Sequence, residues 1–169
     1  MHSKNNHEIF LGFDFGTRNI GVAVGQMITK TATPLNLLHA KNGVPNWDEV
    51  AKLITTWQPQ ALVVGVPCHL DGTPHRITAL AREFIERLTK RYNLPVYEAE
   101  ERLTTKAARE EIYAEGKYKA LQNKNIDSAA AVLILEEWMK KTMNNEYIGR
   151  WIETRKKYYA DFENINGDY

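Results

Sequence analysis

Four acidic residues at three places in the sequence could supply ligands for a metal ion. Asp14 interrupts an apolar segment between two phenylalanines. Glu100 and Glu101 end a second segment with strand character, and Asp127 begins an alanine-rich segment. Hydrolysis of a phosphodiester by two Mg²⁺ ions needs carboxylates that converge from several elements, because the ions lie about 3.5–4 Å apart and prefer oxygen ligands. These residue types therefore indicate metal-assisted phosphodiester chemistry.

Each of these acids also has a purely structural interpretation. Asp14 could accept amide hydrogen bonds in a capped turn, and its own context favours neither interpretation. Adjacent acids on a strand point to opposite faces, so only one of Glu100 and Glu101 can share a site with Asp14. Either acid could instead pair with the arginine that follows. Aspartate is a good N-cap, which alone would explain Asp127. Only the combination of the acids favours a shared site.

The elements that must position these acids follow an α/β pattern. Residues 8–15 alternate with a period of two, and segment 20–25 predicts a partner strand in a hairpin. A third strand is expected over 33–39. The later elements are predicted as a helix from the Asn46 cap to Trp57, a buried strand 61–66, a helix 74–92, a strand 94–100, a helix from 104 or 105 to 115, and a helix 127–139. This order predicts a mixed sheet, with antiparallel hairpin strands followed by parallel strands and flanking helices.

The overall composition limits the possible cellular location, metal ligands and binding partners of the protein. The chain has 169 residues, of which 43% are hydrophobic, and its formal net charge is +1. It has a single cysteine, no long apolar run and a polar N-terminus, which together predict a cytoplasmic protein with no membrane partner. No cysteine or histidine pair has the spacing of zinc ligands. Because the net charge is near neutral, a nucleic-acid-binding function has to be argued from local groups of basic residues.

Four sequence blocks resemble the YqgF/RuvX family of Holliday junction resolvases and pre-16S rRNA nucleases. They are 11–24 (LGFDFGTRNIGVAV), 64–73 (VGVPCHLDGT), 100–108 (EERLTTKAA) and 127–136 (DSAAAVLILE), and they occur in the family order. The resemblance covers roughly residues 8 to 142. It implies an RNase H-like (RuvC-type) mixed five-stranded sheet.

The resemblance also implies a site and a cofactor. Asp14, Glu101 and Asp127 match the family's catalytic, metal-binding triad, with Mg²⁺ or Mn²⁺ as the cofactor. Position 100 is usually aspartate in the family and is glutamate here, so Glu100 stays open as a substitute ligand. Basic residues near the acidic site could hold backbone phosphates. The residues assigned to nucleic-acid binding are Arg18, Arg102, Lys106, Arg109, Lys117 and Lys119.

Three regions are predicted: a flexible N-terminus (1–7), an RNase H-like nuclease domain (8–142) and a C-terminal helical extension (143–169). The expected function is a metal-dependent endonuclease, a hydrolase of phosphodiester bonds, that processes the 5′ end of pre-16S rRNA in ribosome biogenesis. The alternatives are a Holliday junction resolvase acting on branched DNA and a non-catalytic nucleic-acid-binding factor. An ATPase module ranks last, since the phosphate loop of such proteins needs a second domain. The partner is therefore RNA or branched DNA, and the protein is expected to be a monomer or a homodimer.

Overall fold

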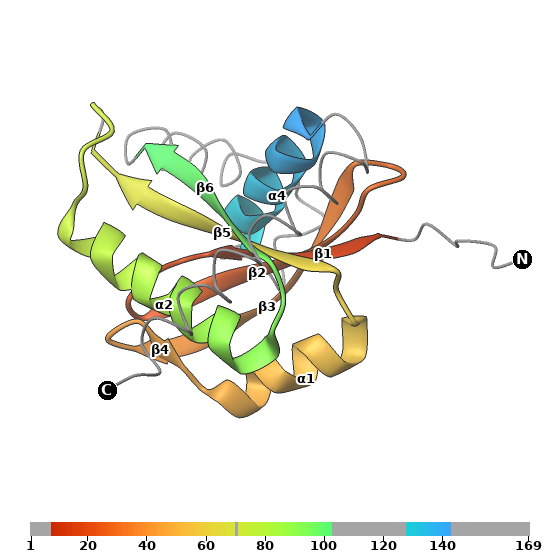
Figure 1. Ribbon diagram of the computed structural model, residues 1–169, viewed down its shortest axis with the longest axis horizontal. Coiled ribbons are helices and arrows are strands. Elements are labelled where there is room, and N and C mark those ends of the chain that lie inside the picture. The colour runs from red at the N-terminus through yellow and green to blue at the C-terminus, as the bar shows by residue number, and fades with distance from the viewer. Residues whose placement is uncertain (1–7, 70, 103–127, 143–169) are drawn as a thin grey trace, which may run out of the picture.

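The computed structural model describes residues 8–69, 71–102 and 128–142 (Figure 1). The predicted helix 104–115, the flexible N-terminus 1–7 and the extension 143–169 lie outside the described residues. The elements in chain order are β1 (Ile9–Asp14), β2 (Asn19–Gln26), β3 (Thr31–Lys41), β4 (Val44–Pro45), α1 (Trp47–Trp57), β5 (Ala61–Cys68), α2 (Arg76–Tyr92), β6 (Val96–Arg102) and α4 (Ala129–Lys141).

The strands form one mixed sheet in the order β4-β3-β2-β1-β5-β6. Strands β1 to β4 pair antiparallel, and β1, β5 and β6 pair parallel, as the sequence predicts. The predicted count of five strands was wrong, because the two-residue strand β4 pairs with the end of β3. A strand of two residues has no periodicity to detect, and the local signal is the pair Asn42-Gly43, which turns the chain with φ values of 51° and 80°.

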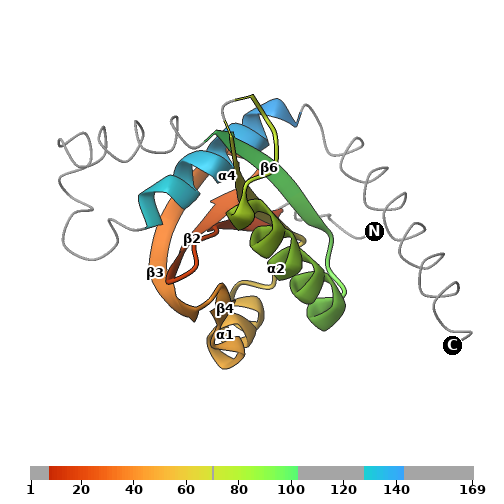
Figure 2. The ribbon, with the colours of Figure 1, turned by 90° about the vertical axis from the view of Figure 1, so that its left-hand side faces the viewer.

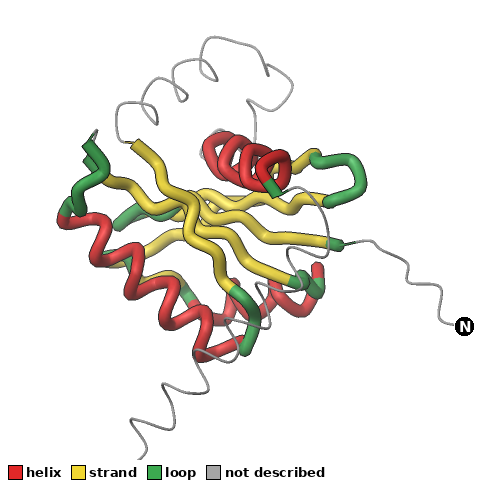
Figure 3. Tube along the Cα trace, turned by 45° about the horizontal axis from the view of Figure 1, so that its top comes forward, coloured by secondary structure: helices red, strands yellow, loops and turns green. Residues whose placement is uncertain are grey.

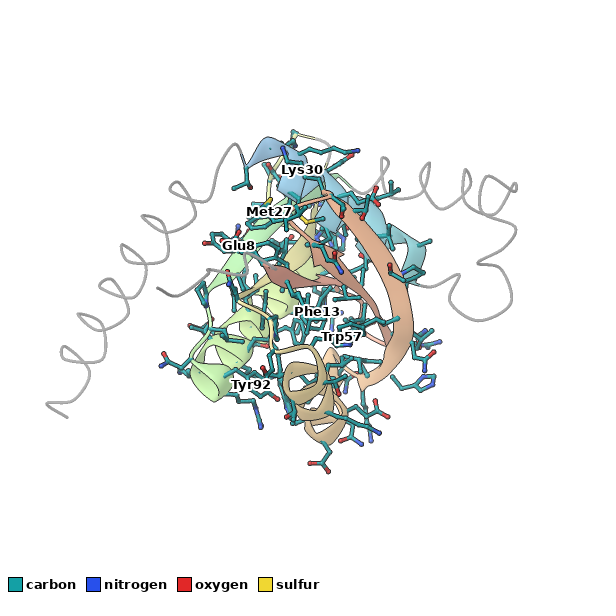
Figure 4. All side chains as sticks on the ribbon, turned by 90° about the vertical axis from the view of Figure 1, so that its right-hand side faces the viewer. Glu8, Phe13, Met27, Lys30, Trp57 and Tyr92 are labelled. Carbon is teal, nitrogen blue, oxygen red and sulfur yellow. The ribbon has the colours of Figure 1, made fainter. Side chains whose placement is uncertain are left out.

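The helices cover both faces of the sheet. In Figure 2, α4 crosses one face, and α1 and α2 lie on the other. Figure 4 shows Phe13 and Trp57 between the sheet and the α1/α2 layer. Of the helices in the described part of the chain, none is long and apolar enough to cross a membrane.

Two helix starts show how local hydrogen bonds set the element boundaries. Asn46 caps α1 as predicted, with its side-chain oxygen accepting the Asp48 N–H at 3.0 Å. Helix α2 begins two residues later than predicted, because His75 is its N-cap and Pro74 instead forms a β-bridge with Cys68. Strand β5 correspondingly continues to Cys68, two residues past its predicted end.

Candidate active site

Asp14 is the last residue of β1 and belongs to the face of the sheet that α4 covers. A Cβ atom built on Gly12 would lie 2.9 Å from the Cβ of Leu135 in α4, so position 12 faces that helix. Side chains two residues apart on a strand share a face, which gives Asp14 the same direction. Its side chain is only 6% exposed. The predicted alternation of β1 is confirmed, since Leu11 and Phe13 belong to the core on the opposite face.

Glu101 reaches the same face from the other side of β5. It pairs with Pro67 in the parallel ladder, yet one carboxylate oxygen lies 3.4 Å from the Cβ position of Gly65. Gly65 is the register partner of Asp14 on β1. Since neighbouring strands lie about 4.8 Å apart, the two acids flank a single glycine on one face. Glu101 is buried as deeply as Asp14, with an exposed fraction of 3%.

Gly65 lies between the two acids and lets Ile134 of α4 approach the strand closely. A Cβ at this position would collide with the Cδ1 of Ile134 in α4 and would contact the Glu101 carboxylate. Any larger residue would therefore require the Ile134 side chain to move and would come into contact with the Glu101 carboxylate. Gly65 lies within the predicted buried strand 61–66, and no functional role is expected for it from the sequence. The available signal was a glycine inside a run of β-branched residues, which is typical of close backbone approach.

Ser128 fixes the start of α4 beside the end of β1. The β2–β3 register shifts between Ile20 and Val22, and the Val22 N–H donates a buried hydrogen bond of 3.0 Å to the Ser128 hydroxyl. Val22 is adjacent to Gly21, the antiparallel partner of Asp14. The Ser128 hydroxyl accepts this hydrogen bond from the sheet and makes no capping hydrogen bond to the first turn of α4. Asp127, the third predicted ligand, lies outside the described residues.

Glu100 lies on the opposite face from Asp14 and Glu101. The Cys68 thiol donates to a Glu100 carboxylate oxygen at 3.5 Å and to the Glu101 carbonyl oxygen at 3.3 Å. Glu98, two residues before Glu100 and therefore on its face, pairs with Arg82 of α2 at 3.2 Å. The geometry brings Glu101, and not Glu100, to the face of Asp14. Cys68, the single cysteine, therefore interacts with both adjacent glutamates of β6.

The predicted basic residues are spread over described and undescribed parts of the chain. Arg18 is exposed in the β1–β2 turn, and its carbonyl oxygen accepts the Ala40 N–H at 2.8 Å. Arg102 is the last residue of β6 and pairs with Cys68 in the ladder. Within residues 8–69, 71–102 and 128–142, no three His, Cys, Asp or Glu side chains are grouped so that they could hold a metal ion. The remaining candidates, Lys106, Arg109, Lys117 and Lys119, lie outside the described residues.

The part of the chain that matches known proteins coincides with the segment from β1 to α4. A family model described as "RuvX: Holliday junction resolvase" matches residues 8–141. The chain belongs to the RuvX family. This membership confirms the resemblance inferred from the four sequence blocks and makes the chain a member of a family of phosphodiester-cleaving nucleases.

Relatives of known name match over most of this RuvX chain. A protein of Actinobacillus pleuropneumoniae serotype 7, named "Putative pre-16S rRNA nuclease", is 52% identical over 130 residues, covering 77% of this chain and 95% of the relative. A protein of Shewanella oneidensis with the same name is 47% identical over 135 residues, covering 80% and 96% of the two chains.

A solved structure supports the fold assignment independently. The fowlpox virus resolvase, determined with Holliday junction DNA, superposes with a TM-score of 0.51 at 14% identity and covers 80% of this chain and 99% of that one. At this identity the likeness concerns the fold alone. The predicted α/β fold, with antiparallel hairpin strands followed by parallel strands, is confirmed, and the described residues form six strands in place of five.

Proposed function

We propose that the chain is a metal-dependent endonuclease with Asp14, Glu101 and Asp127 as its catalytic carboxylates. The observation that carries this proposal is the placement of Asp14 and Glu101 on one face, on either side of Gly65. Burial and mutual repulsion both disfavour two carboxylate charges in one space. A divalent cation bound between them would offset both effects, and Mg²⁺ and Mn²⁺ prefer such oxygen ligands.

Asp127 is proposed as the third ligand because it matches the family motif and precedes Ser128 in the sequence. Ser128 is bonded to Val22, next to the register partner of Asp14. The proposed third ligand, Asp127, directly precedes this serine in the sequence.

The residues present fit a hard cation, since the candidate ligands are all carboxylates. When bound, the cation would supply an activated water and stabilise the charge on the phosphate oxygens. The carboxylates would hold it, and α4 would shield this face from bulk solvent. The side chain of Glu101 would contribute from β6, and that of Asp14 from β1.

The proposed substrate is the 5′ end of precursor 16S rRNA, in the cytoplasm. This choice rests on the names of the two relatives at 52% and 47% identity. Branched DNA is the second candidate, because the family model carries the description of a Holliday junction resolvase. A resolvase acts on two strands and is expected to function as a symmetric pair. The same protein acting on RNA could work as a monomer.

The first experiment tests catalysis. Purified protein is incubated with precursor 16S rRNA in the presence of Mg²⁺ or Mn²⁺, and the Asp14→Asn variant is the matched control because it keeps the shape of the side chain. We expect cleavage by the parent protein and none by the variant, with unchanged circular dichroism. Equal cleavage by both proteins would exclude Asp14 as a ligand.

The second experiment separates the two substrates and the non-catalytic alternative. Precursor rRNA and a four-way DNA junction are compared under identical metal and salt conditions. Preferential cleavage of the junction by a dimeric protein would favour the resolvase. Binding of RNA without cleavage by any divalent metal would instead show a non-catalytic binding factor.

A further inference from the structure

The turn that joins β5 to α2 carries two histidines that the carboxylate site does not use. His69 directly follows β5, and His75 is the N-cap of α2. Both side chains are exposed, and their rings meet edge to face with centroids 4.8 Å apart. The two imidazole rings are therefore neighbours at the surface, and an imidazole can donate a hydrogen bond through a ring N–H.

The turn lies at the end of the sheet where Glu101 is found. Pro67 pairs with Glu101, and Cys68, the last residue before the turn, pairs with Arg102. Figure 3 shows the turn leaving the end of β5 and leading into α2. Since Gly65 is level with Asp14 and a strand rises about 3.3 Å per residue, the turn begins about 13 Å beyond that level.

Hydrogen bonds within the turn hold the two histidines in place. The Asp71 carboxylate accepts the Thr73 hydroxyl at 2.7 Å and the Thr73 N–H at 2.9 Å. The hydroxyl bond, followed by the backbone bond, lowers the pKa of Asp71 below its usual value. The N–H of His69 donates to the Thr73 carbonyl oxygen at 3.0 Å. These hydrogen bonds restrain the backbone of the turn from which the two imidazole rings project.

The hydrogen bonds of His75 determine which of its ring nitrogens can act as a donor. Its Nδ1 accepts the Ile77 N–H at 3.2 Å, so the ring proton is on Nε2 and can be donated to an acceptor. Arg76, the next residue, is also exposed. The first turn of α2 contains no acid, whereas that of α1 contains Asp48 and Glu49. Arg76 thus adds an exposed guanidinium directly after His75 in the sequence, at a helix start whose first turn contains no acid.

We propose that His69, His75 and Arg76 bind a backbone phosphate of the nucleic-acid strand that the carboxylate site cleaves. This inference rests on the proposed nuclease function and adds a contact a few nucleotides from the scissile phosphate. Such a contact positions the strand without reading its sequence. Arginine and imidazole donors suit a phosphate oxygen, which is a charged acceptor.

The experiment measures binding without cleavage, in EDTA, by fluorescence anisotropy. The probes are labelled single-stranded RNA and single-stranded DNA of the same sequence. We expect His69→Ala combined with His75→Asn to weaken binding about tenfold, since asparagine keeps the helix cap but lacks the imidazole donor. We expect Arg76→Gln to reduce the slope of log affinity against log salt by about 1.

Arg87→Gln is the matched control. Arg87 is exposed on the same helix, about 16 Å along the axis from Arg76, and its substitution removes the same charge. The proposal is overturned if the parent protein binds neither probe, if the histidine and Arg76 variants bind like the parent, or if Arg87→Gln weakens binding equally. If the double variant fails to fold, His69→Ala alone provides the same test, because His69 caps no helix. A loss confined to RNA or to DNA supports the site and identifies its ligand.

The two proposals can fail separately. If the parent protein cleaves precursor rRNA and the variants bind normally, only the phosphate site is wrong. If the variants lose binding but the parent never cleaves with any divalent metal, the phosphate site stands and the nuclease function is wrong.

Discussion

The two faces of the sheet are built from the same strands but are filled in different ways. On the α1/α2 face, large side chains such as Phe13, Phe15 and Phe84 interdigitate and are fully buried. On the α4 face, the glycines at positions 12, 25 and 65 let the helix approach the backbone closely. Asp14 and Glu101 lie on this second face. Both faces thus contain an apolar core, and the candidate site shares the face on which glycines let the helix approach.

The glycines explain how α4 can lie so close to the strands that carry the acids. Gly12 and Gly65 let Leu135 and Ile134 of α4 pack directly on the strand backbone. These side chains belong to the apolar cluster that buries this face. The comparison predicts that substitutions on the α1/α2 face change stability and that those on the α4 face also change the site.

The largest effect is expected for Phe84→Ala on the α1/α2 face. Phe84 contacts Phe13, Phe15 and Trp47, with ring centroids 5.7, 5.6 and 6.1 Å away. Its truncation should lower the free energy of unfolding by about 3–5 kcal/mol, as measured by urea denaturation. Phe84→Leu is the control and should cost less, because it retains most of the volume. Equal losses in the two variants would mean that the cavity does not set the cost.

Gly65→Ala tests the close packing of the α4 face. The added methyl group would collide with Ile134 and press on Glu101, at a cost of about 1–3 kcal/mol. Ile134→Val removes the colliding atom and should restore part of the loss in the double variant. Thermal unfolding gives the stabilities, and cleavage assays on the same proteins show whether Glu101 is displaced. Additive losses in the double variant would argue against the collision.

Ser128→Ala tests the link between α4 and the sheet. The variant leaves the Val22 N–H buried without its acceptor, which should cost about 1–3 kcal/mol. Thr142→Val removes a hydroxyl at the other end of α4, where the Trp138 carbonyl oxygen also accepts the Thr142 N–H. This control should cost less in urea denaturation. The reverse order would show that Ser128 does not anchor the helix.

The smallest effect is expected at the surface of the α2 face. Arg82 and Glu98 form an ion pair of 3.2 Å, but their side chains are 55% and 36% exposed. Solvent screening should limit the change in unfolding free energy for Arg82→Gln to less than about 0.5 kcal/mol. A loss above 1 kcal/mol, measured at low and high salt, would contradict this ranking of the two faces.

Most of the sheet could be predicted from the sequence, because periodicity reports which residues are buried. The alternation around Asp14 and the apolar run after Ala61 each gave the correct strand. The strand β4 and the start of α2 could not be predicted. Both depend on pairings between segments, namely β3 with β4 and Cys68 with Pro74. Local propensity does not contain these contacts.

For the candidate site too, some features could be predicted from the sequence and others depend on tertiary contacts. The sequence by itself determined that Asp14 faces away from its apolar neighbours, and that only one of Glu100 and Glu101 could join it, because side chains on a strand alternate. The family motifs selected Glu101, but only the tertiary structure showed its carboxylate over Gly65 and placed Glu100 beside Cys68. Alternation gives relative directions within one strand. Which face becomes a site depends on strand register and on the helix packed above it.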